Sequence, residues 1–183
     1  MIVYPVSGGK TFNFTGVYPS SDPRTESWTA AGSKEEVLGH FAGWSPILRH
    51  IIASTDELLV YPLFDRLPVR TWGEGRVTLL GDAAHPMFPF LAQGAVQAIE
   101  DAWVLAQSLR GVRGSGVPEA LRRYEARRML RTAAIQERSA GANWLMVEDG
   151  PAQTERDAWL ADFRGDPSAW LHGFDAETDA PFR

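Results

Sequence analysis

The sequence predicts an α/β fold, or α+β for the chain taken by itself, in which part of a mixed sheet precedes one strand and several helices. Three observations support this class. β-rich runs flank the pair Gly8-Gly9, a short apolar run covers residues 76–80, and helical periodicity covers residues 94–110 and 118–147. Strands are therefore expected mainly in the first part of the chain and helices in the second.

Length and composition are those of an ordinary globular chain and exclude several classes of protein. The 183 residues carry a formal net charge of −5 and include no cysteine. This excludes disulfides and thiolate metal sites and argues against a nucleic-acid partner. No apolar run approaches the roughly 20 residues of a membrane-spanning helix, and the N-terminus lacks the features of a signal peptide. We therefore expect a cytoplasmic chain, and its start within a strand-like run favours a missing upstream segment.

The first third of the chain is expected to form a hairpin and two short helices. A Ser-Gly-Gly-Lys turn separates the two β-rich runs, and Pro5 marks the first run as an edge strand. Ser33 followed by Glu36 is a capping-box pattern, and Pro46 is typical of a first helical turn. The expected elements are strands over residues 1–6 and 11–18 and helices over residues 34–43 and 46–54.

The rest of the chain is expected to be mainly helical. The apolar run 76–80 predicts a strand buried on both faces. Two apolar stripes, one of them containing Val96, Ile99 and Trp103, predict a mostly buried helix over 94–110. The other expected elements are a β-rich run over 57–69, a turn over 72–75, a glycine-rich break over 111–116, a helix over 118–147 and short helices and turns over 149–183. The apolar stripe of the long helix contains Met129, Ala133, Ala140, Trp144 and Val147.

The stretch GDAAHPMFPFLAQGA joins the predicted strand to the predicted helix. Its Asp82 directly follows the strand, where open α/β sheets bind ligands, and a carboxylate there accepts hydrogen bonds from sugar-type hydroxyls. The helix that begins at Gly94 presents amides without partners and the positive end of its dipole. The stretch therefore predicts a hydroxyl acceptor at one end and an anion site at the other. A long ligand with a polyol and an electron-accepting ring would suit both.

The longer segment GRVTLLGDAAHPMFPFLAQGAVQAIEDAWVLAQSL resembles the second flavin-binding motif of the class A flavoprotein monooxygenases. These are the aromatic hydroxylases typified by p-hydroxybenzoate hydroxylase, and the salicylate hydroxylase-like branch is the most similar. YPLFDRLPVRTW before the motif, and RRYEARRMLRTAAIQERS and WLHGFDAETD after it, also look like that branch. The resemblance covers most of residues 58–175.

The resemblance implies an FAD-dependent monooxygenase that hydroxylates a phenolic acid-like substrate with NADH or NADPH and O2. Asp82 matches the residue that binds a hydroxyl of the FAD polyol, and Pro89 matches the proline beside the reactive edge of the flavin. Gln93 matches a residue beside the ring. The remaining cofactor-binding matches are Gly81 in the motif turn and Gly94, Ala95 and Val96 at the helix start. Many family members have Asn at the position of Val96, so one side-chain contact is lost here. No residue is assigned a catalytic role, and no metal is expected.

One expected part of the family pattern is absent from this sequence. The turn G-x-G-x-x-G, which binds the ADP half of FAD, does not occur. The chain therefore looks like the C-terminal portion of such an enzyme, and either a homodimer or a missing N-terminal half would complete it. The expected parts are a partial substrate-binding domain over 1–70, the C-terminal part of a Rossmann-like FAD-binding domain over 71–148 and a helical tail over 149–183. The alternative is a non-catalytic remnant or partner subunit.

Several residues have a structural interpretation that competes with a functional one. His85 is more often structural than catalytic in such a context, and Gly-Asp-x-x-His superficially resembles the motif of metal-dependent phosphoesterases. The arginine run is interpreted as a solvated helix face paired with Glu119 and Glu125, with an anion or partner site as the alternative. The run comprises Arg122, Arg123, Arg127, Arg128 and Arg131. Four aromatic residues suit either a substrate pocket or strand core: Tyr4, Phe12, Phe14 and Tyr61.

Overall fold

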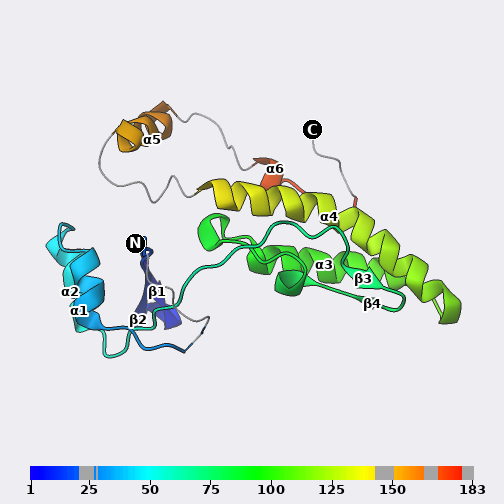
Figure 1. The fold of residues 1–183 in the computed structure, drawn as a ribbon, viewed down its shortest axis with the longest axis horizontal. Coiled ribbons are helices and arrows are strands. Elements are labelled where there is room, and N and C mark those ends of the chain that lie inside the picture. Colours follow the sequence, from blue (N-terminus) through cyan, green and yellow to red (C-terminus); the bar gives the residue numbers. More distant parts are fainter. Residues whose placement is uncertain (21–26, 28, 143–150, 163–168, 179–183) are drawn as a thin grey trace. The chain divides into compact units, whose positions relative to one another are not determined.

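The computed structural model describes residues 1–20, 27, 29–142, 151–162 and 169–178, which form two compact units (Figure 1). The units are Met1–Leu63 and Phe64–Arg183. In the described part of the chain, no helix has the length and apolar character needed to cross a membrane.

The N-terminal unit begins with the expected hairpin. Strands β1 (Ile2–Val6) and β2 (Thr11–Thr15) pair antiparallel, and a short 3-10 turn η1 (Ser7–Gly9) joins them. The turn has positive φ at both of its glycines, a conformation that glycine adopts without steric cost. Proline in β1 is tolerated because a two-stranded sheet leaves one edge of each strand unpaired.

Two short helices follow at the expected places. Helix α1 (Lys34–His40) is capped by Ser33, whose Oγ accepts a hydrogen bond from the backbone N–H of Glu36 at 3.2 Å. Helix α2 (Pro46–Ser54) has proline in its first turn. The two helices share a small core built from Val37, Phe41 and Ile52.

The β-rich interpretation of residues 57–69 is wrong, because an isolated bridge between Ala31 and Leu59 is the one strand-type pairing in that range. Two prolines interrupt the run and remove backbone donors. Of the four candidate aromatic residues, Phe14 packs beside the core of α1 and α2. The other three are exposed, with Phe12 66% exposed.

The C-terminal unit begins with a minimal hairpin. Strands β3 (Gly73–Glu74) and β4 (Val77–Thr78) pair antiparallel around Gly75, whose φ is +60°. The prediction of a strand buried on both faces over 76–80 is wrong. Val77 is 69% exposed, and no strand other than β3 pairs with β4 in the described part of the chain. Two 3-10 turns follow, η2 (Gly81–Ala83) and η3 (Pro89–Leu91).

Helices α3 (Gly94–Leu109) and α4 (Val117–Gly141) pack against each other and form the largest part of this unit (Figure 1). The 3-10 turn η4 (Gly114–Gly116) separates them, as the glycine-rich break predicts. α4 is expected to continue to residue 147, but Trp144 and Val147 lie outside the described residues. Helices α5 (Pro151–Asp162) and α6 (Ala169–His172) follow, in agreement with short helices in this part of the chain.

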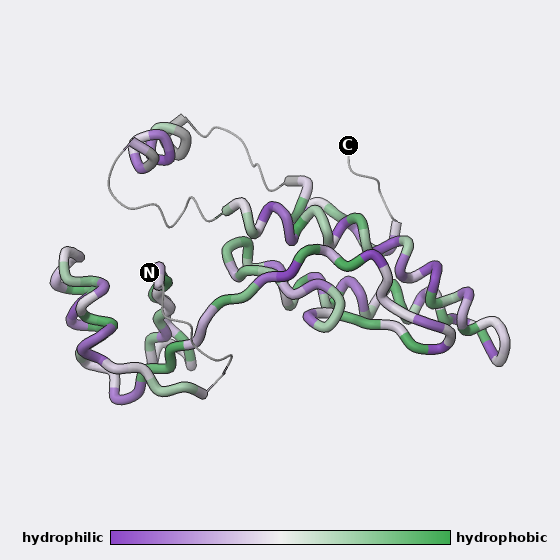
Figure 2. Tube along the Cα trace, viewed as in Figure 1, coloured by the Kyte–Doolittle hydropathy of each residue, from purple (hydrophilic) through white to green (hydrophobic). Residues whose placement is uncertain are grey.

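The buried face of α3 is not the face that its apolar stripes predict. Gln97 and Asp101 are completely buried, whereas Ile99 is 71% exposed and Val96 and Trp103 are each exposed by more than two fifths. Figure 2 shows hydrophilic residues recurring along α4, the helix that packs against this face. The prediction of a mostly buried helix is therefore wrong for this stripe, because much of the buried face of α3 is polar.

Tyr124 provides a test of this packing. It is completely buried beside Trp72, and its hydroxyl donates a hydrogen bond to the carbonyl of Leu79 at 3.2 Å. We expect Tyr124→Phe to lower the free energy of unfolding by about 1 kcal/mol, because the hydrogen bond from this hydroxyl to the Leu79 carbonyl is lost. Urea unfolding followed by circular dichroism measures this. Tyr4→Phe, at an exposed hydroxyl, is the control, and an equal loss in both variants would contradict the prediction.

Candidate functional site

Gly81 starts the candidate site in a backbone conformation that favours glycine. Its φ is +60°, and a Cβ atom at this position would lie 3.3 Å from the Cβ of Ala98 on α3. Its N–H donates a hydrogen bond to Asp101 Oδ2 at 3.0 Å. The lack of a side chain therefore lets residue 81 lie close to α3, and the hydrogen bond from its amide holds it there.

The structure brings Asp82 to the beginning of α3. Its carboxylate is exposed, and a Cβ atom built on Gly94 would lie 3.7 Å from Asp82 Oδ1. The absence of a side chain at Gly94 therefore leaves open the space beside this carboxylate. Between the two residues, Pro89 starts η3 and is exposed, and Ala92, in the left-handed region at φ +52°, turns the chain into α3.

The N-terminus of α3 has no side-chain cap. Gln93 is the N-cap residue, but its side chain makes no capping hydrogen bond. That side chain is buried, and its Oε1 accepts a hydrogen bond from Gln97 Nε2 at 3.1 Å. The amides of Gly94, Ala95 and Val96 belong to the first turn, in which helix N–H groups have no intrahelical acceptor. The site thus presents a carboxylate next to the positive end of a helix dipole.

His85, which follows Asp82 by three residues, is structural. Its ring is completely buried beside Trp72, and Nε2 donates to Asp101 Oδ2 at 2.6 Å. Its Nδ1 has no hydrogen-bond partner among the described residues. In the described part of the chain, no three acidic or histidine side chains converge as metal ligands would.

The arginine run of α4 divides into exposed and buried members. Arg122 pairs with Glu119 at 2.9 Å on the surface, as the sequence predicts. Arg128 and Arg131 are buried, so the interpretation of the whole run as a solvated face is wrong. Glu125 also departs from that interpretation, because it accepts a hydrogen bond from the Thr78 hydroxyl at 2.7 Å.

Arg128 joins α4 to α3 through three groups on α3. Its Nε lies 2.6 Å from Asp101 Oδ1, and its Nη1 lies 2.7 Å from Glu100 Oε2. Its Nη2 donates to Gln97 Oε1 at 2.7 Å. Every guanidinium nitrogen of this completely buried side chain therefore has an acceptor, which is the condition for burying a charge at tolerable cost.

Arg131 extends the same network towards the C-terminal segment. It binds both carboxylate oxygens of Glu100 at 2.8 Å, and its Nη2 donates to the carbonyl of Leu171 at 3.0 Å. Its guanidinium also lies 3.8 Å from the centre of the Phe174 ring. The network thus connects the turn at Gly81, both long helices and the segment around α6.

Burial and hydrogen bonding oppose each other at the two acidic residues of the network. Burial by itself would raise the pKa of Asp101, but hydrogen bonds from His85, Arg128 and the Gly81 amide hold it below its ordinary value. Burial opposes the charged form of Glu100 in the same way, and Arg131 and Arg128 lower its pKa. Burial raises the pKa of Tyr124 far above its ordinary value, and the nearby charge of Asp101 adds to this effect.

Helix α4 also holds the loop that precedes α3. Gln136 Nε2 donates to the carbonyl of Pro86 at 2.9 Å, and Ser139 Oγ donates to the carbonyl of Phe88 at 2.5 Å. The loop over residues 81–93 is therefore fixed by side chains from both helices.

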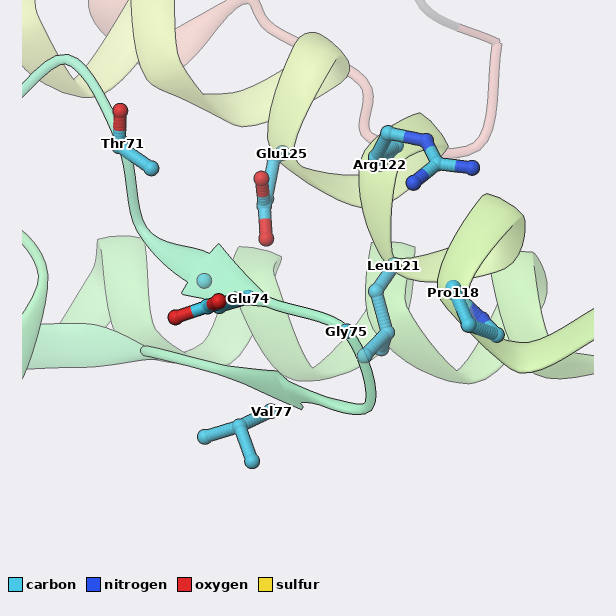
Figure 3. Close-up of a pocket in the computed structure, with 9 residues that line it drawn as sticks. Thr71, Glu74, Gly75, Val77, Pro118, Leu121, Arg122 and Glu125 are labelled. Atoms are coloured by element: carbon cyan, nitrogen blue, oxygen red, sulfur yellow. The ribbon is translucent and has the colours of Figure 1, made fainter.

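A separate hollow lies between the β3–β4 hairpin and the start of α4 (Figure 3). Glu74, Arg122 and Glu125 are its charged residues. None of the residues predicted to bind the cofactor lines it.

Sequence reasoning missed the roles of Asp101, Glu100 and Gln97, and it placed Arg128 on a solvated helix face. A usable signal was present, because polar residues recur at positions 97, 100, 101 and 108 in a helix that is otherwise largely apolar. The spacing of these residues places them on one helical face.

Residues 50–139 match the family model described as an FAD binding domain. The 3-amino-4-hydroxybenzoate 2-monooxygenase of Streptomyces platensis is 42% identical over 94% of this chain and 44% of its own length. The 3-hydroxybenzoate 6-hydroxylase of Polaromonas naphthalenivorans is 36% identical over 95% of this chain and 44% of its own length. A salicylate hydroxylase in complex with substrate superposes with a TM-score of 0.76 at 27% identity, over 97% of this chain and 45% of that one.

These matches confirm the family resemblance and the mixed α/β fold class that the sequence predicts. The chain spans less than half the length of the curated relatives that it matches.

The conformation of Gly81 leads to a prediction with a matched control. An alanine in the left-handed backbone conformation typically costs about 1–2 kcal/mol. We expect Gly81→Ala to lower the free energy of unfolding by more than this, because the new Cβ also crowds Ala98. Gly111→Ala is the control, since Gly111 has φ +71° but open space around it. Chemical unfolding of both variants measures the difference, and equal losses would show that the contact with Ala98 is relaxed without cost.

The lowered pKa of Glu100 predicts how stability depends on pH. The contribution of Glu100 is fully present above its ordinary pKa of 4.5 and is lost as the pH falls through the lower value in the folded chain. We therefore expect Glu100→Gln to be less stable than the parent at pH 7, with a shallower loss of stability below pH 4.5. Glu119→Gln, at an exposed ion pair, is expected to change neither quantity appreciably. Parallel acid-unfolding curves for the parent and Glu100→Gln would contradict the prediction.

Proposed function

From these matches we propose that this chain belongs to the FAD-binding family that includes the aromatic hydroxylases, and that it forms the flavin-facing part of a monooxygenase. The substrate proposed is a small aromatic ring that carries a hydroxyl and a carboxylate. The three related proteins support this class, since their names refer to 3-amino-4-hydroxybenzoate, 3-hydroxybenzoate and salicylate.

The observation that carries the proposal is the juxtaposition of Asp82 and the uncapped N-terminus of α3. An exposed carboxylate accepts hydrogen bonds from the hydroxyls of a ribityl chain, which is the polyol part of FAD. The first amides of α3, at Gly94, Ala95 and Val96, suit the negative charge that a reduced flavin ring carries. The space left at Gly94 lets a ring approach the backbone closely.

The bound FAD would supply the redox chemistry, with NADH or NADPH as the electron donor and O2 as the source of the oxygen atom. The balanced reaction converts an aromatic C–H, O2, NAD(P)H and a proton into a phenolic C–OH, water and NAD(P)+. The chain's own residues bind and orient the cofactor. Asp82 would hold the polyol, Pro89 would border the ring, and the α3 amides would stabilise negative charge on it. Gly81 and Gln93 would contribute to cofactor binding indirectly. Gly81 forms the turn that precedes Asp82, and Gln93 is the residue at which α3 begins.

A second candidate is a non-catalytic partner subunit of such an enzyme. The exposed apolar residues Val96, Ile99 and Trp103 on α3 favour it, because a row of this kind at helical spacing is typical of a surface that another polypeptide covers. FAD uptake by the purified chain separates the two candidates, since the partner subunit requires none.

The proposal predicts a specific loss of FAD affinity. We expect Asp82→Ala to weaken FAD binding about tenfold or more, because a charged acceptor of hydrogen bonds is removed. Titration of the purified chain with FAD, followed by flavin fluorescence and absorbance, measures the affinity.

Glu74→Ala, which removes another exposed carboxylate of the same unit, is the control and should leave FAD affinity unchanged. A parent chain that binds no FAD would contradict the proposal for this chain. An Asp82→Ala variant with parental affinity would contradict the role of Asp82. Where FAD binds, oxidation of NADH and NADPH in the presence of hydroxybenzoates tests the reaction.

A further inference from the structure

We propose that Asp101 is a positioning residue for the flavin-facing loop, acting through Gly81 and His85 rather than by contact with the cofactor. The proposal rests on the proposed function insofar as the loop binds FAD. Its structural content, that one buried carboxylate sets the conformation of residues 81–85, is independent of the cofactor.

The first support is the contact between Asp101 and the residue next to Asp82. Asp101 Oδ2 accepts the N–H of Gly81, in a sharp turn with φ +60°. Because Asp82 directly follows Gly81, the direction in which its carboxylate points depends on this turn. The hydrogen bond is buried, so water does not compete for the donor.

The second support is that the same oxygen also holds the far end of the turn. His85 Nε2 donates to Asp101 Oδ2 at 2.6 Å, and both side chains are completely buried. Within the turn, the amides of Ala84 and His85 donate to the Gly81 carbonyl at 2.8 and 2.9 Å. One carboxylate oxygen therefore binds the first and the last residue of a closed five-residue turn.

The third support is that Arg128 orients the carboxylate. Its Nε donates to Oδ1 at 2.6 Å, so Oδ2 is left to face the turn. An asparagine at position 101 cannot reproduce this arrangement, since it has one oxygen and one amino group. The charge of Arg128 attracts the oxygen, and the amino group is then directed at the donors of Gly81 and His85. The conformation of the turn is thus linked to α4 through a single side chain.

The test compares Asp101→Asn with Leu121→Ala in the full chain. Leu121 is buried near the start of α4 beside the β3–β4 hairpin, so its truncation lowers stability without touching the turn. Hydrogen exchange in the absence of FAD is measured at residues 81–85 and along α4. We expect Asp101→Asn to speed exchange in the turn about tenfold beyond any change in α4, whereas Leu121→Ala changes both in proportion.

Two further measurements separate positioning from general stability. In 15N spectra the imidazole of His85 should show a protonated Nε2 held by a hydrogen bond in the parent and in Leu121→Ala, and should lose this signature in Asp101→Asn. FAD affinity should fall about tenfold more in Asp101→Asn than in Leu121→Ala.

The proposal would be overturned if hydrogen exchange at residues 81–85 changed in proportion to exchange in α4 in both variants. It would also be overturned if the His85 spectrum were unchanged in Asp101→Asn. A parent chain that binds no FAD would overturn the proposed function alone, and the exchange and His85 measurements would still decide the role of Asp101.

Discussion

The buried ion pair between Asp101 and Arg128 is the interaction on which the rest of the C-terminal unit depends. Both side chains are inaccessible to solvent, and each uses its remaining polar atoms on a different part of the unit. Burying two charges is costly, and removal of one partner of such a pair generally costs about 3–5 kcal/mol because the other is left uncompensated. Here the pair is hydrogen-bonded to Gly81, His85, Glu100 and Gln97, so the arrangement of the helices and the loop that satisfies all of these bonds is favoured.

This constraint explains why α3 turns its polar side inward. Asp101 and Gln97 need the arginine of α4, and the helical rotation that brings them there points Ile99 and Trp103 outward. The outward apolar row is therefore a consequence of the inward polar one. Gly94, at the uncapped start of α3, lies beside Asp82, so the candidate flavin site combines a carboxylate with the positive end of a helix dipole.

Local signals in the sequence were sufficient for many of the elements. The glycine pair in the first hairpin, the Ser33 cap, Pro46 and the helix start at Gly94 each act within a few residues, so pattern and propensity predict them. The segment 75–109, together with the similar stretches before and after it, was enough to indicate the family. The placement of its residues at a cofactor stays a prediction.

Features that depend on distant partners could not be predicted in this way. The burial of Arg128 depends on acceptors 27 to 31 residues away, and a basic run on a helix is otherwise typical of a solvated face. Apolar residues at 76–80 and 57–69 indicate strands, but a strand needs a neighbour, and the described chain provides β3 and a single bridge. His85 is buried because Asp101 is, and periodicity carries no information on that pairing.

The three acceptors of Arg128 also specify a single alignment of the two long helices. Contacts between apolar side chains are not directional, so they discriminate less sharply between alternative alignments of two helices than hydrogen bonds do. A slip of α4 by one turn, about 5.4 Å, would carry the guanidinium beyond Gln97, Glu100 and Asp101 together and leave several buried donors without acceptors. Hydrogen-bond geometry thus disfavours alternative packings of α3 and α4. Because the position of α4 along α3 is set in this way, Gln136 and Ser139 lie where they can donate to the carbonyls of the loop that precedes α3.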